Sequence, residues 1–318
     1  MSEHPKFKPD DYPTLFIEQT DKELAKKLNP NFRYAYFKTI AKGGKSLIQS
    51  CKDMYLNRVI AYKSLLPEFA DDPIEQMRLL REARVSAMLQ HPNTLPTYEV
   101  GRNNKGHIYF TMKLVQGYSL RQIFDYRERY DLTQMMDIIV QVAHALEYAH
   151  THGVIHRDIK PENILVGPFG EVLLMDWGLA KVWSESGEVS PYDEVEPAKG
   201  SDAMSMTGFQ KLQGTVCYMS PEQIDKDPDI DKLTDIYSLG IILYEALTGR
   251  TPAEGDTIDK VIKSTKEDVP PRPSQVVSGS IPSVLEHTVM TCLEKNPKDR
   301  IASAAELIRL LQQSLSIR

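Results

Sequence analysis

The sequence predicts an α+β fold of two lobes, a small β-rich lobe followed by a larger helical one. Short segments rich in strand-forming residues fill the chain before Gly117, interrupted by a single helical pattern. Beyond Gly117, apolar residues recur at helical spacing, as Met136, Ile139, Ala143 and Leu146 do. Because a cleft between two lobes is a usual ligand site, we expect a binding site there.

Five strands and one helix are expected in the first lobe. The strands are predicted over residues 34–40, 46–52, 59–65, 98–100 and 107–114. Asp72 followed by Pro73 is typical of a helix start, since aspartate caps the first turn and proline fits its first position. This helix should stop before Pro92, because the residue ahead of a proline disfavours helical geometry.

The second lobe is expected to be mainly helical. One helix contains Met136 to Leu146 and should end at Gly153. An apolar helix is predicted over residues 230–248, and an amphipathic one over 302–316. Residues 181–213 are polar and acidic, which favours a long loop. Residues 1–32 are expected to be a polar N-terminal extension with a short helix near 22–28, and residues 33–315 the folded domain.

Composition excludes several classes of function. The 318-residue chain carries a net charge of −6 and no long basic run, so nucleic acid is not an expected partner. No apolar run approaches a membrane span in length. The three cysteines, Cys51, Cys217 and Cys292, show neither metal nor disulfide spacing. These features predict a cytoplasmic protein with no membrane segment in this chain.

Residues 156–165 carry the chemistry of the chain. They read His-Arg-Asp-Ile-Lys-Pro-Glu-Asn-Ile-Leu, and Asp176-Trp177-Gly178 follows shortly after. Together these segments supply two carboxylates, an ammonium and an amide on neighbouring loops. Such a set can accept a proton from a hydroxyl, neutralise a phosphoryl group and bind magnesium. An isolated aspartate in a loop more often caps a turn, but the whole motif favours the catalytic interpretation.

This motif closely resembles the catalytic loop of the eukaryotic-type protein kinases, with Asp-Trp-Gly similar to their Asp-Phe-Gly. The phrases Thr-Met-Lys-Leu-Val, Asp-Trp-Gly-Leu-Ala-Lys and Tyr-Met-Ser-Pro-Glu-Gln look most like the bacterial serine/threonine members. The resemblance implies a two-lobed kinase fold, with an N-lobe over 33–112, a hinge over 113–117 and a C-lobe over 118–315. It also implies ATP-dependent phosphorylation of serine and threonine hydroxyls in proteins.

The resemblance implies a role for each polar residue of the motif. Asp158 would be the catalytic base, and Lys160 would neutralise the migrating phosphoryl group. Asn163 and Asp176 would bind Mg²⁺ or Mn²⁺ together with ATP. Lys160 also favours the serine/threonine branch over the tyrosine-specific one.

Lys63 and Glu82 are expected to form an ion pair that holds the ATP phosphates. Lys63 lies in a predicted strand and Glu82 in the following helix, as in the family. The glycine-rich loop departs from the family's three-glycine pattern. Ala41 stands at its first glycine and Ser46 at its third, which leaves Gly43 and its neighbour Gly44.

Further residues are expected around the adenine and the substrate. The resemblance places these residues against the nucleotide: Ala41, Gly43, Gly44, Ile48, Ala61, Lys63, Met112, Lys113, Val115 and Leu165. Glu222 should pair with Arg300, and Asp235 should anchor the catalytic loop from beneath. Thr215 is expected near Asp158 and Lys160.

Phosphorylation of the acidic segment is a further expectation from the resemblance. Arg157 would receive a phosphate from this activation loop, and Thr207 and Ser205 are the candidate acceptors, with autophosphorylation as the route.

Three alternatives to an active serine/threonine kinase stay open. A pseudokinase that binds nucleotide or a partner without transfer is suggested by the altered glycine-rich loop and Trp177. A small-molecule kinase would share the base and metal ligands, but usually lacks the Lys160 context and the Ser-Pro-Glu stretch. A tyrosine-specific kinase is disfavoured by Lys160 and Thr215. A homodimer through the N-lobe is also expected by analogy with the bacterial relatives.

Overall fold

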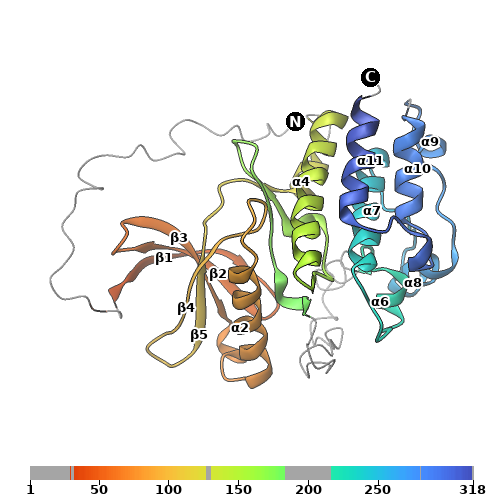
Figure 1. The fold of residues 1–318 in the computed structure, drawn as a ribbon. Helices are drawn as coiled ribbons and strands as arrows, with labels where there is room; N and C mark the ends of the chain where they lie inside the picture. The colour runs from red at the N-terminus through yellow and green to blue at the C-terminus, as the bar shows by residue number, and fades with distance from the viewer. Residues whose placement is uncertain (1–28, 30–31, 127–129, 183–215, 280, 317–318) are drawn as a thin grey trace. The chain divides into compact units, whose positions relative to one another are not determined.

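The computed structural model describes residues 29, 32–126, 130–182, 216–279 and 281–316 (Figure 1). The chain divides into two compact units. We call Met1–Gln90 with Leu95–Gly117 the β-rich unit, and His91–Thr94 with Tyr118–Arg318 the helical unit. The predicted α+β fold class is confirmed. The helix predicted near 22–28 and most of the acidic segment lie outside the described residues.

The β-rich unit is built on a five-stranded antiparallel sheet with the order β1-β2-β3-β5-β4. Its strands are β1 (Tyr34–Lys42), β2 (Ser46–Asp53), β3 (Arg58–Leu65), β4 (Thr97–Arg102) and β5 (Ile108–Met112). All five predicted strands are present, although β5 is shorter than expected. Helix α2 (Pro73–Met88) packs against β3, β4 and β5, and the short 3₁₀ helix η3 (Pro67–Phe69) precedes it (Figure 1).

Helix α2 begins where the sequence predicts. Asp72 has extended geometry, and its side chain accepts hydrogen bonds from the backbone N–H groups of Ile74 and Glu75. These contacts satisfy donors that have no partner within the helix. Leu79 and Ala83 are buried one turn apart, which fixes the face that α2 turns towards the sheet.

The helical unit has helix α7 (Leu233–Thr248) at its centre, with nearly every side chain buried. Helices α4 (Leu132–Thr151) and α10 (Ser283–Cys292) pack against α7, and α11 (Ala304–Ser316) packs against α4 and α10 (Figure 1). The remaining helices among the described residues of this unit are α3 (Leu120–Asp125), α6 (Pro221–Ile224), α8 (Ile258–Glu267) and α9 (Pro273–Val276), with 3₁₀ helices η5 (Pro161–Asn163), η6 (Trp177–Leu179) and η8 (Pro297–Asp299).

Two small antiparallel sheets complete the helical unit. One has the order β6-β8-β9 and the other pairs β10 with β7. Their strands are β6 (Tyr118–Ser119), β7 (Val154–Ile155), β8 (Ile164–Val166), β9 (Val172–Leu174) and β10 (Lys181–Val182). The loops between these strands carry the motif residues of the sequence.

The helix predicted from residue 230 begins later, at Leu233. The Asp231 side chain accepts a hydrogen bond from the backbone N–H of Leu233, so a turn precedes the helix. Its end agrees with expectation: Gly249 has φ +79°, the left-handed geometry that favours glycine after a helix. Gly153, which follows α4, has φ +71°.

His91–Thr94 belong to the helical unit although their chain neighbours lie in the β-rich one. The Asn93 amide donates to the Gln141 side chain at 3.0 Å and to the Val172 carbonyl at 2.8 Å. The carbonyl of Asn93 in turn accepts a hydrogen bond from the backbone N–H of Leu174. This short segment is therefore held by α4 and β9.

Candidate active site

Asp158, Lys160 and Asn163 lie together in the loop between β7 and β8. Lys160 Nζ is 2.8 Å from each carboxylate oxygen of Asp158. Asn163 Nδ2 donates to the backbone carbonyl and to Oδ2 of Asp158, both at 2.9 Å. Pro161 opens η5, and this tight turn returns Asn163 towards Asp158. The structure thus brings three predicted site residues into direct contact.

The pKa of Asp158 is raised above its ordinary value. Burial is the largest cause, and the neighbouring charge of Asp176 adds to it, while Lys160 acts in the opposite direction. A carboxylate with a raised pKa is a better proton acceptor. Asp158 therefore has the environment that a general base requires.

Asp235 supports this loop from helix α7, as predicted. Its two carboxylate oxygens accept the backbone N–H groups of His156 and Arg157, each at 2.9 Å. His150 Nε2 donates to Oδ2 at 2.8 Å. Burial opposes the charge of Asp235, but these hydrogen bonds and the histidines outweigh it, so its pKa is lowered. Asp235 is therefore an ionised anchor beneath the loop.

Arg157 has φ +65°, a left-handed conformation that is uncommon for a residue with a side chain. Its guanidinium donates to the Leu179 carbonyl at 2.7 Å, and its own carbonyl accepts the Gln223 side chain at 2.7 Å. The predicted role of Arg157 towards a phosphate stays a prediction, because Thr207, Ser205 and Thr215 lie outside the described residues.

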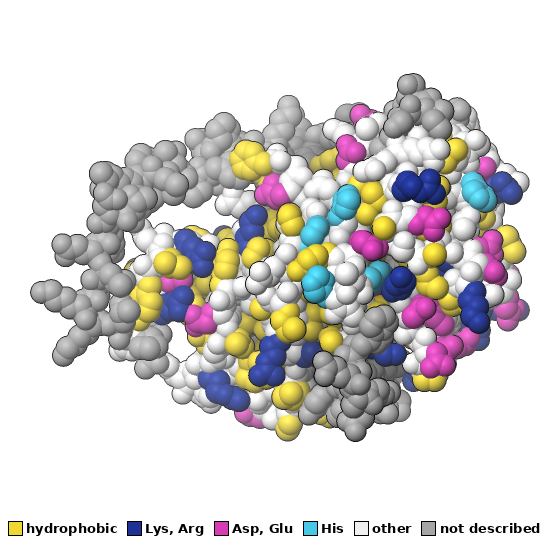
Figure 2. Space-filling model, in the orientation of Figure 1, with side chains coloured by type: hydrophobic (Ala, Val, Ile, Leu, Met, Phe, Trp, Pro, Cys, Tyr) yellow, Lys and Arg dark blue, Asp and Glu magenta, His cyan; other side chains and the backbone are white. Residues whose placement is uncertain are grey.

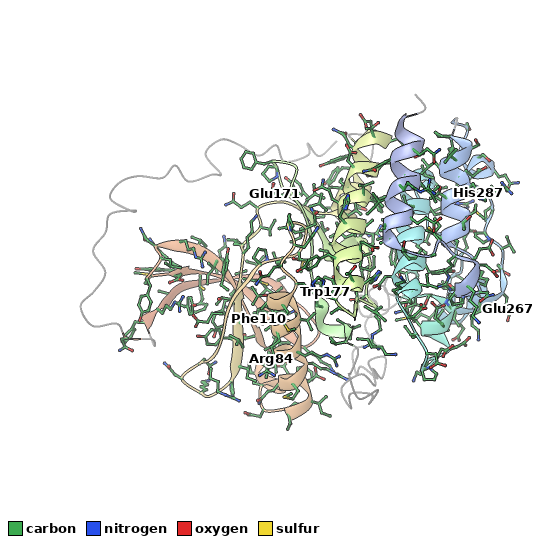
Figure 3. All side chains as sticks on the ribbon, in the orientation of Figure 1. Arg84, Phe110, Glu171, Trp177, Glu267 and His287 are labelled. Atoms are coloured by element: carbon green, nitrogen blue, oxygen red, sulfur yellow. The ribbon has the colours of Figure 1, made fainter. Side chains whose placement is uncertain are left out.

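Asp176 follows β9 and has φ +67°. The backbone N–H of Met175 donates to the Asn163 carbonyl at 2.9 Å, so the segment that carries Asp176 is tied to the segment that carries Asn163. Trp177, labelled in Figure 3, is fully buried, and its ring centroid is 4.5 Å from that of His156. The tryptophan at this position therefore packs against the catalytic loop.

Lys63 and Glu82 form the expected ion pair inside the β-rich unit. Lys63 Nζ on β3 is 2.6 Å from Glu82 Oε1 on α2, and both residues are buried, at 6% and 7% exposure. Phe110 of β5, labelled in Figure 3, lies close by, with its ring centroid 5.9 Å from Lys63 Nζ. The pair joins the sheet to the helix.

The Ser-Pro-Glu stretch is fastened as predicted. Arg300 Nη1 and Nη2 reach Glu222 Oε1 and Oε2 at 2.6 Å and 2.7 Å. The Ser220 hydroxyl is 2.6 Å from the Thr234 hydroxyl, and Ser220 forms a capping box with Gln223 at the start of α6.

Comparison with known proteins agrees with this set of contacts. The family model described as protein kinase domain matches residues 34–311. The chain belongs to the protein kinase family. Protein kinase domains in general use ATP and a divalent metal, so the cofactor class follows from membership.

Bacterial serine/threonine-protein kinases are similar to this kinase chain. PknD of Protochlamydia amoebophila is 33% identical over 295 residues, which cover 89% of this chain and 30% of that protein. PknD of Mycobacterium tuberculosis is 31% identical over 274 residues, 86% of this chain and 38% of that protein. A probable serine/threonine-protein kinase of Clostridium acetobutylicum is 32% identical over 276 residues, 87% and 39% respectively. The chain spans about a third of the length of these relatives.

The glycine turn of this kinase joins β1 to β2. The backbone N–H of Gly43 donates to the Ser46 carbonyl at 2.8 Å, and Ala41 pairs with Ile48 across the two strands. A Cβ at Gly43 would lie 3.2 Å from Ser46 Oγ, whereas one at Gly44 would meet nothing within 4 Å. Only Gly43 therefore has a close neighbour that disfavours a side chain.

The predicted adenine contacts divide between the two units. Ala61 and Met112 are buried strand partners on β3 and β5. Lys113 donates its backbone N–H to the Pro96 carbonyl at 3.0 Å, and Val115 follows in the same unit. Leu165 lies on β8 of the helical unit. Each residue has a place on its own unit, and their predicted contacts with ATP stay predictions.

Asn163 and Asp176 suit a hard divalent cation in their chemistry. The Asn163 amide nitrogen already donates to Asp158, so its side-chain oxygen is the atom left for a ligand role. Within the described ranges, no three His, Cys, Asp or Glu side chains gather into a group able to bind a metal. ATP phosphates and water would have to complete the coordination.

A charged cluster around Arg121 on α3 was not predicted from the sequence. Its guanidinium donates to Glu162 of the catalytic loop at 3.0 Å and to Glu245 of α7 at 2.6 Å. It also contacts the Tyr218 hydroxyl, which itself donates to Glu245. Burial is the main cause that raises the pKa of Tyr218, so the hydroxyl stays protonated. These residues are far apart in the sequence, and no motif or spacing predicts that they meet.

Proposed function

We propose that this chain is an active serine/threonine protein kinase, which transfers the γ-phosphoryl group of ATP to protein hydroxyls. The observation that carries the proposal is the contact of Asp158 with Lys160 and Asn163 above the ionised anchor Asp235. The bacterial relatives are named as serine/threonine kinases, which supports the choice of acceptor.

The chain's own residues account for the transfer step. The bond from the acceptor oxygen to the γ-phosphorus forms as the bond to the β,γ-bridging oxygen breaks, and ADP leaves. Asp158 takes the hydroxyl proton late in this step. Lys160 neutralises the phosphoryl oxygens, and Lys63, held by Glu82, binds the α- and β-phosphates.

Asn163 and Asp176 would hold Mg²⁺ or Mn²⁺. When bound, this ion would neutralise the charge of the phosphates. The donor set supports the assignment, because both side chains supply the oxygen atoms that such cations prefer.

Phosphoryl transfer can be tested directly. The protein is incubated with labelled ATP, Mg²⁺ and a generic protein substrate, beside Asp158→Ala and Lys63→Ala. Phosphoserine or phosphothreonine that disappears in both variants supports the proposal. Nucleotide binding without transfer in the unaltered protein would instead establish a pseudokinase. That alternative is suggested by Ala41 and Ser46, which replace two glycines of the family's glycine-rich loop.

Activation-loop phosphorylation, dimerisation and localisation extend the proposal. We propose that Thr207 or Ser205 is autophosphorylated. Mass spectrometry that finds no phosphate on residues 181–215 of active protein, with full activity in the Thr207→Ala, Ser205→Ala double variant, would refute it.

We also propose a cytoplasmic location for this chain. Within the described ranges, no helix is long and apolar enough to cross a membrane.

A homodimer through the β-rich unit is supported by exposed apolar side chains. Tyr36, Phe37 and Ile40 on β1 are 79%, 45% and 50% exposed. Figure 2 shows hydrophobic side chains, in yellow, on the surface of this unit. Exposed apolar groups are typical of association surfaces when they are contiguous. Sedimentation of the protein beside Ile40→Asp would detect a monomer–dimer shift, and an unaltered monomer at all concentrations would refute the dimer.

A further inference from the structure

Two buried glutamates of α2 are each paired with a lysine from the sheet side of the β-rich unit. Glu82 meets Lys63 at 2.6 Å, and Glu75 meets Lys45 at 2.7 Å. Both glutamates are 7% exposed. Because seven residues make two helical turns, Glu75 and Glu82 lie on the same face of α2. The helix is thus held to the sheet at two points along one line.

Lys45 belongs to the glycine turn, and its backbone is fixed as well as its side chain. The Lys45 carbonyl accepts the backbone N–H of Leu66 at 2.9 Å, directly after strand β3, which carries Lys63. Within the same turn Gly43 bonds to Ser46. The Lys45–Glu75 pair therefore connects the phosphate-cradling turn with the first turns of the helix that carries Glu82.

The second partner of Glu75 cannot make this connection. Arg78 Nη1 is 2.8 Å from the same carboxylate oxygen, but Arg78 lies on α2 itself. Removing Lys45 would leave Glu75 compensated by Arg78, so the fold should survive. The Lys45 side chain is 41% exposed and that of Glu75 is 10% exposed, and a pair that is open to solvent at its lysine end adds little to the free energy of unfolding. The Lys45–Glu75 pair should therefore act mainly on the position of α2.

We propose that the Lys45–Glu75 pair sets the position of α2 so that Glu82 meets Lys63, which makes Lys45 a positioning residue for nucleotide binding. The inference rests on the proposed function. The turn lacks the first and third glycines of the family pattern, with Ala41 and Ser46 in their places. The ion pair of Lys45 with Glu75 fixes the position of this altered turn relative to α2.

The test compares Lys45→Met, Lys45→Arg and the control Lys38→Met, an exposed β1 lysine for which the described residues show no ion pair. The affinity for MgATP is measured by calorimetry. Lys45→Met should weaken it about twofold to fivefold, the range expected for a partly exposed pair. Lys45→Arg should restore it, and Lys38→Met should leave it unchanged. Equal affinity for Lys45→Met and the unaltered protein would overturn the inference.

A double-mutant cycle separates positioning from a direct contact with ATP. In a Glu82→Gln background, Lys45→Met should cause no further loss of affinity, because its effect passes through Glu82. Additive losses would overturn the proposal. So would normal affinity in Glu75→Gln beside weak affinity in Lys45→Met, since Lys45 would then act on the nucleotide itself.

Hydrogen exchange without nucleotide gives an independent readout. Residues 73–88 should exchange faster in Lys45→Met than in Lys38→Met, and equal rates would contradict the proposed anchor. Failure here is distinguishable from failure of the proposed function. A protein that binds MgATP but transfers no phosphate refutes the kinase activity alone, whereas an active kinase with additive losses refutes the positioning role alone.

Discussion

Arg300 and Glu222 form a bidentate ion pair in the interior of the helical unit, although they are 78 residues apart in sequence. The Arg300 side chain is 0% exposed and that of Glu222 is 9% exposed. Arg300 also donates to the backbone carbonyls of Leu233, Glu294 and Lys295. The pair therefore fastens α6 to the start of α7 and to the loop before α11.

Loss of this pair should destabilise the kinase strongly. Glu222→Gln leaves a buried guanidinium without its counter-ion, and the free energy of unfolding should fall by about 3–5 kcal/mol. The matched control is Lys266→Gln, which breaks the surface pair with Asp225 at the same 2.6 Å distance. Exposed pairs contribute below about 1 kcal/mol, so the control should unfold almost normally. Equal losses in urea denaturation of the two variants would contradict this interpretation.

Asp235→Asn should destabilise the protein at neutral pH, because the ionised carboxylate accepts three hydrogen bonds. The folded-state pKa of Asp235 is lowered. The contribution of Asp235 to the free energy of unfolding is therefore fully present above its pKa in the unfolded chain, which is about 3.9 for aspartate. It is lost as the pH falls through the lower pKa of the folded state. The stability gap between the unaltered protein and the variant should narrow only below about pH 4. A gap that closes between pH 5 and 7 would show that another group is responsible.

Asp158 should impose an acid limb on the pH profile of kcat/KM. Because its pKa is raised, the limb should lie above the value of about 4 typical of an exposed aspartate. Activity requires the deprotonated form, so it should fall as the pH drops through this value. Asp158→Asn should lower kcat by about 10²–10⁴, the range of general base catalysis. Retention of more than a tenth of kcat would argue against Asp158 as the base.

Gly240→Ala should disrupt the packing of α7 on α10. A Cβ at Gly240 would lie 2.5 Å from the Cβ of Cys292, too close for both atoms. Overpacking of this kind costs about 1–3 kcal/mol, against the roughly 1 kcal/mol that alanine gains over glycine in a helix, so the net loss should be up to about 2 kcal/mol. Cys292→Gly in the same chain should recover part of the loss, because it removes the opposing atom.

Gly44→Ala is the control for this substitution, since nothing lies within 4 Å of that position. Thermal denaturation of the three variants tests the prediction. A stability of Gly240→Ala equal to that of Gly44→Ala would refute the close contact.

The sequence predicted those parts of the site that local chemistry determines. Asp158, Lys160 and Asn163 are close in the chain, so one turn at Pro161 is enough to bring them together. The pairing of Glu222 with Arg300 and the anchoring of the catalytic loop by Asp235 were predicted correctly, because the family resemblance supplied these long-range contacts. Spacing alone would not have joined Glu222 to Arg300.

The contacts that were not predicted depend on tertiary packing. Lys45 and Glu75 are 30 residues apart, and each looks like an ordinary surface charge in the sequence. Arg121 meets Glu245 across 124 residues for the same reason. The late start of α7 was missed because apolar periodicity does not reveal the turn that Asp231 makes with Leu233.

The short segment His91–Thr94 has a consequence for how the two units are joined. The backbone passes between the units after Gln90, again after Thr94, and a third time after Gly117. A protease that cuts once, at residue 117, would leave no covalent link between residues 1–117 and 118–318, but the hydrogen bonds of Asn93 to Gln141, Val172 and Leu174 would still join the two fragments. The two fragments should therefore migrate as one species on a native gel and as two on a denaturing gel.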